Sequence, residues 1–442
     1  GSYRKSGLRA KINVVIQDGS QGGPEAIAGW SSASPRPVRF HRATGKPPGQ
    51  TACRADRNPW SGYNQRGCLT GSFSVLRISV KRYLLFTLIV LLVGFLCLRT
   101  YKTRPGNAAV LYHQAIVELP PAEVWNEFVL GSVRIGGKPA PGTIAIIERY
   151  ERPLELLQQA KNLPVCNWGI DLKNGPHQDF KFVTEAVKLA RLALERARLR
   201  FAEGDIAEGL RDWEAGMMLD RRLRGEPLVL FSLAGAKAEE IGIQKIAPFL
   251  PRFSPAELAR LDEIIRSLPP TQDLATIIDT EYQLGYGWYE SMLSTDRTEL
   301  LRMLMERSLT REEFEKRIAI LRQELADLKP AFARRYPEML SQLNYPELSP
   351  ATREFLPPLI RALGNVAKVD CEVAMLRAAA AVQAGRQDAL TTIFDPLTGE
   401  PFEITRWNGG FRLYSQAKID DKPIDWIFGN PIEPEPANST NL

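Results

Sequence analysis

The sequence predicts a mainly α-helical protein with a membrane anchor helix, a domain of antiparallel helix pairs and a small C-terminal antiparallel β-hairpin. An uncharged apolar run lies near residue 90 of the 442 residues. Between residues 105 and 390, apolar residues recur every three or four positions behind typical capping residues. After residue 400, two short alternating segments flank a glycine-rich turn. We take these three observations in chain order.

Residues 80–104 are expected to form a transmembrane anchor with its flanks. The run Tyr83–Leu98 has sixteen uncharged residues. As a helix it would rise about 24 Å, against about 30 Å of hydrocarbon. The basic side chains of Lys81, Arg82 and Arg99 could reach the headgroups and complete the span. A cleaved signal peptide and a buried core helix are the alternatives.

The orientation prediction rests on the order of segments. Basic residues near the two ends of the run nearly balance, so the positive-inside rule barely discriminates. A basic segment followed by an apolar run normally stays in the cytoplasm. We therefore expect a single-pass membrane protein that contacts lipid through its anchor and has an extracytoplasmic, periplasmic C-terminal domain.

Residues 1–79 read as a basic disordered or non-native N-terminal extension. They are rich in Gly, Ser, Pro and Arg without apolar periodicity. The first methionine is Met217, so translation could begin at an alternative codon near Val75 or Val80. Residues 1–82 carry 14 Lys+Arg and 3 Asp+Glu, a net charge of +11, so the total of +6 leaves −5 beyond them. The basic balance is therefore no argument for nucleic acid binding, and we expect none.

The clearest helix pair begins at Phe180. The first predicted helix, Phe180–Glu203, has one apolar stripe, with Glu195 and Arg198 on another face. Gly204 ends it, and Asp205 with Glu208 is a capping signal for the next helix. Helices joined so tightly are antiparallel and share their apolar faces.

Other helices of 105–390 carry similar signals. We predict helices over Asn107–Glu118 and over Thr143–Leu163, the latter interrupted at Pro153. Capping boxes occur at Ser254 with Glu257 and at Thr310 with Glu313. The last predicted helix is Leu359–Gln383, which is rich in alanine and carries Cys371 in its apolar stripe.

Residues 391–431 are predicted to be a small β module. Strands are expected over Pro401–Thr405 and Phe411–Ser415, joined through Asn408-Gly409-Gly410. Asp425–Phe428 could add a third strand.

The predicted hairpin has one apolar face. Phe402 and Ile404 alternate with polar residues on one strand, as Phe411 and Leu413 do on the other. An isolated two-stranded hairpin is marginal in water, so we expect this face to dock on the helices. Residues 432–442 read as a disordered tail.

The order of these parts resembles a group of uncharacterised single-anchor helical envelope proteins of planctomycete-type bacteria. The resemblance rests on CNWGIDL at 166–172, the charged helix after Phe180, DPLTGEPF at 395–402 and GFRLYS at 410–415. The last two patterns are also similar to the C-terminal β-region of type II secretion pseudopilins. The resemblance implies location and architecture and brings no activity.

Asp420, Asp421 and Asp425 are the candidate metal ligands. Clustered carboxylates can supply the oxygen ligands that calcium requires, and the resemblance to pseudopilins makes calcium the ion to consider. A solvated acidic turn is the alternative.

Cys166 and Cys371 are the cysteines beyond the anchor run. An oxidising compartment would permit a disulfide between them, but sequence does not fix their separation. Two buried free thiols are the alternative.

No nucleophile elbow, phosphate loop or dinucleotide-binding turn occurs in the sequence, so we predict no catalytic residue and no cofactor apart from calcium. The expected function is binding, as an envelope scaffold or in recognition of an unknown protein partner in the envelope. A pseudopilin-like secretion component and an envelope hydrolase of unrecognised type are the alternatives.

Overall fold

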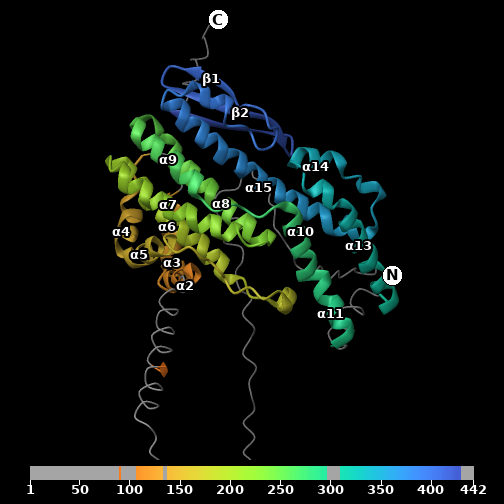
Figure 1. Cartoon of the computed structure of the whole chain (residues 1–442). Helices are drawn as coiled ribbons and strands as arrows, with labels where there is room; N and C mark the ends of the chain where they lie inside the picture. Colours follow the sequence, from red (N-terminus) through yellow and green to blue (C-terminus); the bar gives the residue numbers. More distant parts are fainter. Residues whose placement is uncertain (1–88, 91–105, 133–136, 296–308, 430–442) are drawn as a thin grey trace, which may run out of the picture. The chain divides into compact units, whose positions relative to one another are not determined.

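Helices dominate the part of the chain that the structure describes, and its three strands follow the described helices. The computed structural model describes residues 89–90, 106–132, 137–295 and 309–429. Figure 1 shows the strands over α15 (Pro350–Gln383), followed by α8 (Val229–Ile246), α7 (Ile206–Arg224) and α6 (Lys181–Glu203), each contacting the next. The mainly helical fold with a small C-terminal antiparallel sheet is confirmed.

The anchor prediction falls almost wholly outside the described residues. Of the run 83–98, only Ile89 and Val90 are described. The predictions for 1–79 and 432–442 also lie outside them. Among the described residues, no helix has both the length and the apolar character needed to cross a bilayer.

The helices between residues 108 and 161 contribute to a second hydrophobic core, separate from the main core that contains residues of α15 and of the sheet. Their bounds are α2 (Ala108–Val117), α3 (Ala122–Ser132), α4 (Pro141–Arg149) and α5 (Glu151–Lys161). The side chain of Asn107 caps α2 by accepting a hydrogen bond from the Ala109 amide at 3.1 Å. The helical segment predicted over 143–163 is interrupted, but at Tyr150, between α4 and α5, and not at Pro153. Pro153 lies in the first turn of α5, where a missing N–H costs nothing.

The predicted antiparallel pair is α6 and α7. Gly204 ends α6 with a φ of 85°, and the side chain of Asp205 caps α7. The helices approach closely at Gly209, where an added Cβ would lie 2.5 Å from the ring of Phe201. A glycine at this position therefore sets the separation of the two helices.

Glu195 and Arg198 are fully buried, although their position away from the apolar stripe suggested a separate polar face. Both sides of α6 are covered, because its apolar residues contribute to two separate cores. Glu195 forms ion pairs with Arg198 at 3.1 Å and with Lys245 at 2.6 Å. A buried charge is tolerated when it is paired in this way.

Several of the remaining helices contact α15. Capping boxes are present at Ser254 and Thr310, as predicted. The remaining described helices are η2 (Leu172–His177), η3 (Ala247–Arg252), α9 (Pro255–Ser267), α10 (Leu274–Tyr282), the π-helix η4 (Gln283–Gly287), α11 (Trp288–Thr295), α13 (Arg311–Phe332), α14 (Tyr336–Gln342), η5 (Tyr345–Glu347) and η6 (Gln387–Thr391).

Helix α15 begins nine residues before the predicted start at Leu359. Ser349 is its N-cap, and the prolines at 357 and 358 lie inside it. The carboxylate of Glu324 accepts hydrogen bonds from Ser349 and Thr352. A negative group at a helix N-terminus is stabilising, so this contact with α13 stabilises the N-terminus of α15 at Pro350. The prolines inside the helix had suggested a later start.

The sheet consists of β1 (Glu403–Trp407), β2 (Gly410–Ile419) and β3 (Lys422–Gly429), in that order and antiparallel. Asn408-Gly409 is the first turn, and Gly409 has a φ of 91°. Asp420-Asp421 is the second turn, with φ values of 50° and 60°. The second turn therefore meets the requirement of a type I′ hairpin turn, which is a positive φ at both central residues.

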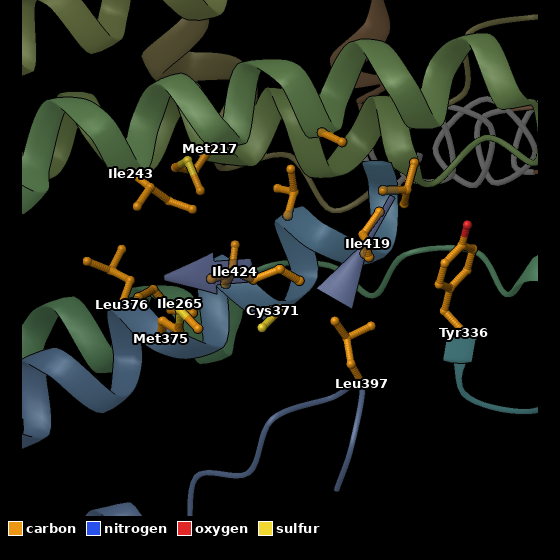
Figure 2. Close-up of a cluster of buried hydrophobic side chains, with 14 of the residues drawn as sticks. Met217, Ile243, Ile265, Tyr336, Cys371, Met375, Leu376, Leu397, Ile419 and Ile424 are labelled. Atoms are coloured by element: carbon orange, nitrogen blue, oxygen red, sulfur yellow. The ribbon is translucent and has the colours of Figure 1, made fainter. Parts of the chain in front are cut away.

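The sheet docks on the helices through its apolar face, as expected. Phe402, Phe411 and Leu413 are buried in the same core as α15. Figure 2 shows Ile419 and Ile424 of the sheet beside the α15 side chains of this core.

The residue patterns at 395–402 and 410–415 have a structural explanation. The buried carboxylate of Asp395 accepts hydrogen bonds from the Leu397 amide at 2.8 Å and from the hydroxyls of Thr398 and Ser415. Gly399 has a φ of 77°, and the guanidinium of Arg335 lies where its Cβ would be. Asp395 therefore fastens the turn of the first pattern to Ser415 of the second pattern, which lies in β2.

Replacing Phe411 with alanine should lower the free energy of unfolding by about 3–5 kcal/mol, because its ring is 5% exposed within the shared core. Ile427→Ala is the matched control in the same sheet, since Ile427 is 44% exposed and should cost less than about 1 kcal/mol. Denaturant unfolding of the full chain gives both values. Small and equal losses of unfolding free energy in the two variants would contradict docking of the sheet.

Candidate functional site between α8, α15 and β3

A groove of about 460 Å³ lies where the helices meet the sheet. Helix α8 contributes Glu240 and Gln244, and α15 contributes Lys368 and Glu372. The third wall is the segment Pro423–Ile427 of β3. Side chains from both faces of this edge strand line the groove, so it runs along the strand edge. We call this feature the β3 groove.

Lys368 organises the charged part of the β3 groove. Its ammonium lies 3.2 Å from Glu240 of α8 and 3.1 Å from Glu372, one turn along α15. Burial alone would lower the pKa of Lys368, but Glu372 and Glu240 raise it above the usual lysine value. Burial raises the pKa of Glu372 against the opposing effect of Lys368. The lysine is thus held charged between two acidic side chains.

The other part of the β3 groove is apolar and aromatic. Trp426 is half-buried, and Ile427 exposes 44% of its surface. The indole N–H of Trp426 lies towards Glu372 and lowers its pKa. Neither Trp426 Nε1 nor Glu372 Oε2 has a hydrogen-bond partner of normal geometry among the described residues. The groove therefore offers an apolar surface and fixed charges together.

A second charged cluster lies on the inner side of the same helices. The Arg224 guanidinium of α7 donates to Glu239 of α8 at 2.6 Å and to Asp370 of α15 at 2.7 Å. Arg221 forms an ion pair with Glu239 at 2.7 Å. Asp220 is fully buried beside them. Charged groups thus join α7, α8 and α15 directly behind the groove.

The structure places the three predicted calcium ligands in different settings. Asp420 and Asp421 are the exposed central residues of the β2–β3 turn. Asp425 lies in the β3 groove, where it accepts a hydrogen bond from Arg412 at 2.8 Å. Within the described parts of the chain, no three acidic, histidine or cysteine side chains are grouped so that they could hold a metal ion. Calcium binding stays an untested prediction.

Cys166 and Cys371 are both free thiols in the structure. Cys371 is buried in the main core, while Cys166 packs against the core formed around α2 and α5. Burial raises the pKa of Cys166 to about 12 and raises that of Cys371 further, so neither is a reactive thiolate. Both cysteines are thus free in the structure, and of the two only Cys371 is buried.

Sequence reasoning missed Glu240, Lys368, Glu372 and Trp426 as site residues. Lys368 and Glu240 are 128 residues apart in the chain. Charged residues on amphipathic helices normally face water, so their residue types gave no signal. The one local hint is the i, i+4 spacing of Lys368 and Glu372.

Comparisons with protein-family models, with curated proteins and with solved structures each found no match.

Lys368→Met should lower the free energy of unfolding by about 1–2 kcal/mol, because it leaves the buried Glu372 carboxyl without its cation. The value lies below that of a fully buried pair because the Lys368 side chain is 36% exposed. Lys237→Met removes the exposed neighbour of Glu240 and should cost below about 0.5 kcal/mol. Urea unfolding of both variants at neutral pH measures the difference, and equal losses would contradict a role for Lys368 in holding the groove.

Proposed function

We propose that the protein is a membrane-tethered, extracytoplasmic helical protein that acts by binding a protein partner in the cell envelope. The β3 groove is the recognition surface in this proposal. Residues 80–104 supply the tether and the contact with lipid. The resemblance to single-anchor envelope proteins implies this architecture.

The observation that carries the proposal is the composition of the β3 groove. Ile427 and Trp426 present apolar surface, as the centre of a protein interface does. Lys368 and Glu240 hold each other in place, so their charges are arranged before a partner arrives. Preorganised polar groups lower the cost of binding. This arrangement suits a polypeptide segment that carries both apolar and charged side chains.

The pseudopilin-like alternative is less well supported. It requires an extended N-terminal helix directly before the β module. The described residues before β1 instead form many helices, which share cores with each other and with the sheet. For an envelope hydrolase, no arrangement of a nucleophile with a base has been found among the described residues of the groove.

A photo-crosslinking residue at position 427 of the full-length protein tests the proposed recognition surface. In intact membranes, it should give one discrete crosslinked product, because Ile427 lines the β3 groove. The same residue at position 320 is the control, since Ile320 is exposed on α13 and not in the groove. Lys368→Glu should abolish the product at 427. Equal products at both positions, or none at 427, would refute the proposal.

The proposed tether gives a separate prediction. The full-length protein should remain with membranes after carbonate extraction, because the run Tyr83–Leu98 would span the bilayer. Deletion of residues 80–104 should move the folded part to the soluble fraction. Recovery of the full-length chain in that fraction would refute the anchor.

A further inference from the structure

The contact between α7 and α8 contains a carboxyl group that has no means of being solvated. Asp220 is 0% exposed, and neither of its side-chain oxygens has a hydrogen-bond partner among the described residues. Gly235 of α8 packs directly on this turn, since an added Cβ would lie 2.5 Å from the Asp220 carbonyl oxygen. We call the contact formed by Asp220, Arg224, Gly235 and Glu239 the α7–α8 seam.

The arginines around Asp220 form ion pairs with other carboxylates. On α7, Arg221 and Arg224 both pair with Glu239 of α8. Arg224 also pairs with Asp370 of α15, and Tyr112 of α2 lies near enough to Asp220 to sense its charge. An ionised Asp220 would therefore stand beside a second carboxylate in a dry seam, without a hydrogen bond of its own.

Burial, followed by the neighbouring Glu239, raises the pKa of Asp220 well above its usual value, against the opposing effects of Arg221 and Arg224. A raised pKa of an acid means that the folded state binds more protons than the unfolded chain. Stability then falls as pH rises above the unfolded value of about 3.9. A difference of one proton changes the unfolding equilibrium constant by up to about tenfold for each pH unit in that window.

Helix α8 links this seam to the β3 groove. Glu239 faces the seam, while the next residue, Glu240, lines the groove and pairs with Lys368. Gln244 lies one turn further along the same wall. Any movement of α8 that admits water to Asp220 also displaces Glu240.

We propose that the α7–α8 seam is a proton-operated latch on the β3 groove: Asp220 carries a proton while the helices are packed, and loss of that proton loosens α8 and reshapes the groove. The regulatory meaning of the latch rests on the proposed binding function. The linkage between proton and helix packing does not, so it is tested on the protein alone.

Hydrogen exchange of the full-length protein, corrected for the intrinsic pH dependence of exchange, tests the latch. Protection of the α8 amides in the wild type should fall as pH rises above the unfolded value of about 3.9. In Asp220→Asn it should stay constant, because the neutral amide does not ionise. Amides of α13, which lies outside the seam, are the internal reference.

Asp212→Asn is the matched control on the same helix. Like Asp220, Asp212 is buried, with 1% of its surface exposed. Unlike Asp220, it accepts hydrogen bonds from Arg196 at 2.6 and 2.8 Å and from Gln158 at 2.8 Å. In this variant the α8 amides should be less protected than in the wild type at every pH. Their protection should still change with pH as it does in the wild type. If Asp220→Asn retains the wild-type pH dependence, or loses protection at every pH as Asp212→Asn does, the latch is refuted.

Infrared spectroscopy of the wild type keeps the proposal testable should Asp220→Asn fail to fold. The carbonyl band of a protonated carboxylic acid should be present while the α8 amides are protected and should disappear as α8 loses protection. Loss of α8 protection without loss of that band would refute the latch. A failure of crosslinking at position 427 would instead refute the binding function and leave these measurements unaffected.

Discussion

The Arg224 guanidinium is the contact on which the helical arrangement depends. It lies in α7, donates to Glu239 of α8 and to Asp370 of α15, and is 1% exposed. Burial alone would lower the pKa of Arg224, but Glu239 and Asp370 raise it, so the cation persists in the core. Arg221 also pairs with Glu239, so two arginines face the two carboxylates of Glu239 and Asp370, and loss of either carboxylate would leave one positive charge unbalanced. The three helices are therefore held in one relative position.

That constraint extends to the β module. Helix α15 carries Asp370 towards the Arg224 cluster, while Cys371 lies in the core that covers the sheet and Lys368 and Glu372 line the β3 groove. One short stretch of helix therefore meets the ion pairs, the apolar core and the groove. Helices α8 and α15 form two walls of the groove, and the edge strand β3 forms the third.

Local signals in the sequence were sufficient for much of the fold. Ser254 and Thr310 cap their helices as predicted, because a capping box depends on residues three positions apart. The start of α15 was misplaced because Pro357-Pro358 suggested a boundary, whereas the true start depends on Glu324 of another helix. The groove and the seam were not predictable. Periodicity cannot show that a charged residue such as Glu195 or Asp220 meets a second helix, nor that Glu240 and Lys368 converge.

The separation of Arg224 from Asp370 has a consequence for biosynthesis. The two residues are 146 positions apart, so at about 5–20 residues per second a ribosome adds Asp370 roughly 7–30 s after Arg224. During that interval, α6, α7 and α8 can pair, but the apolar surface that α15 will cover stays open to water. The nascent chain passes through a stage with exposed hydrophobic surface and an incompletely neutralised arginine, and protection by a chaperone would be most valuable then.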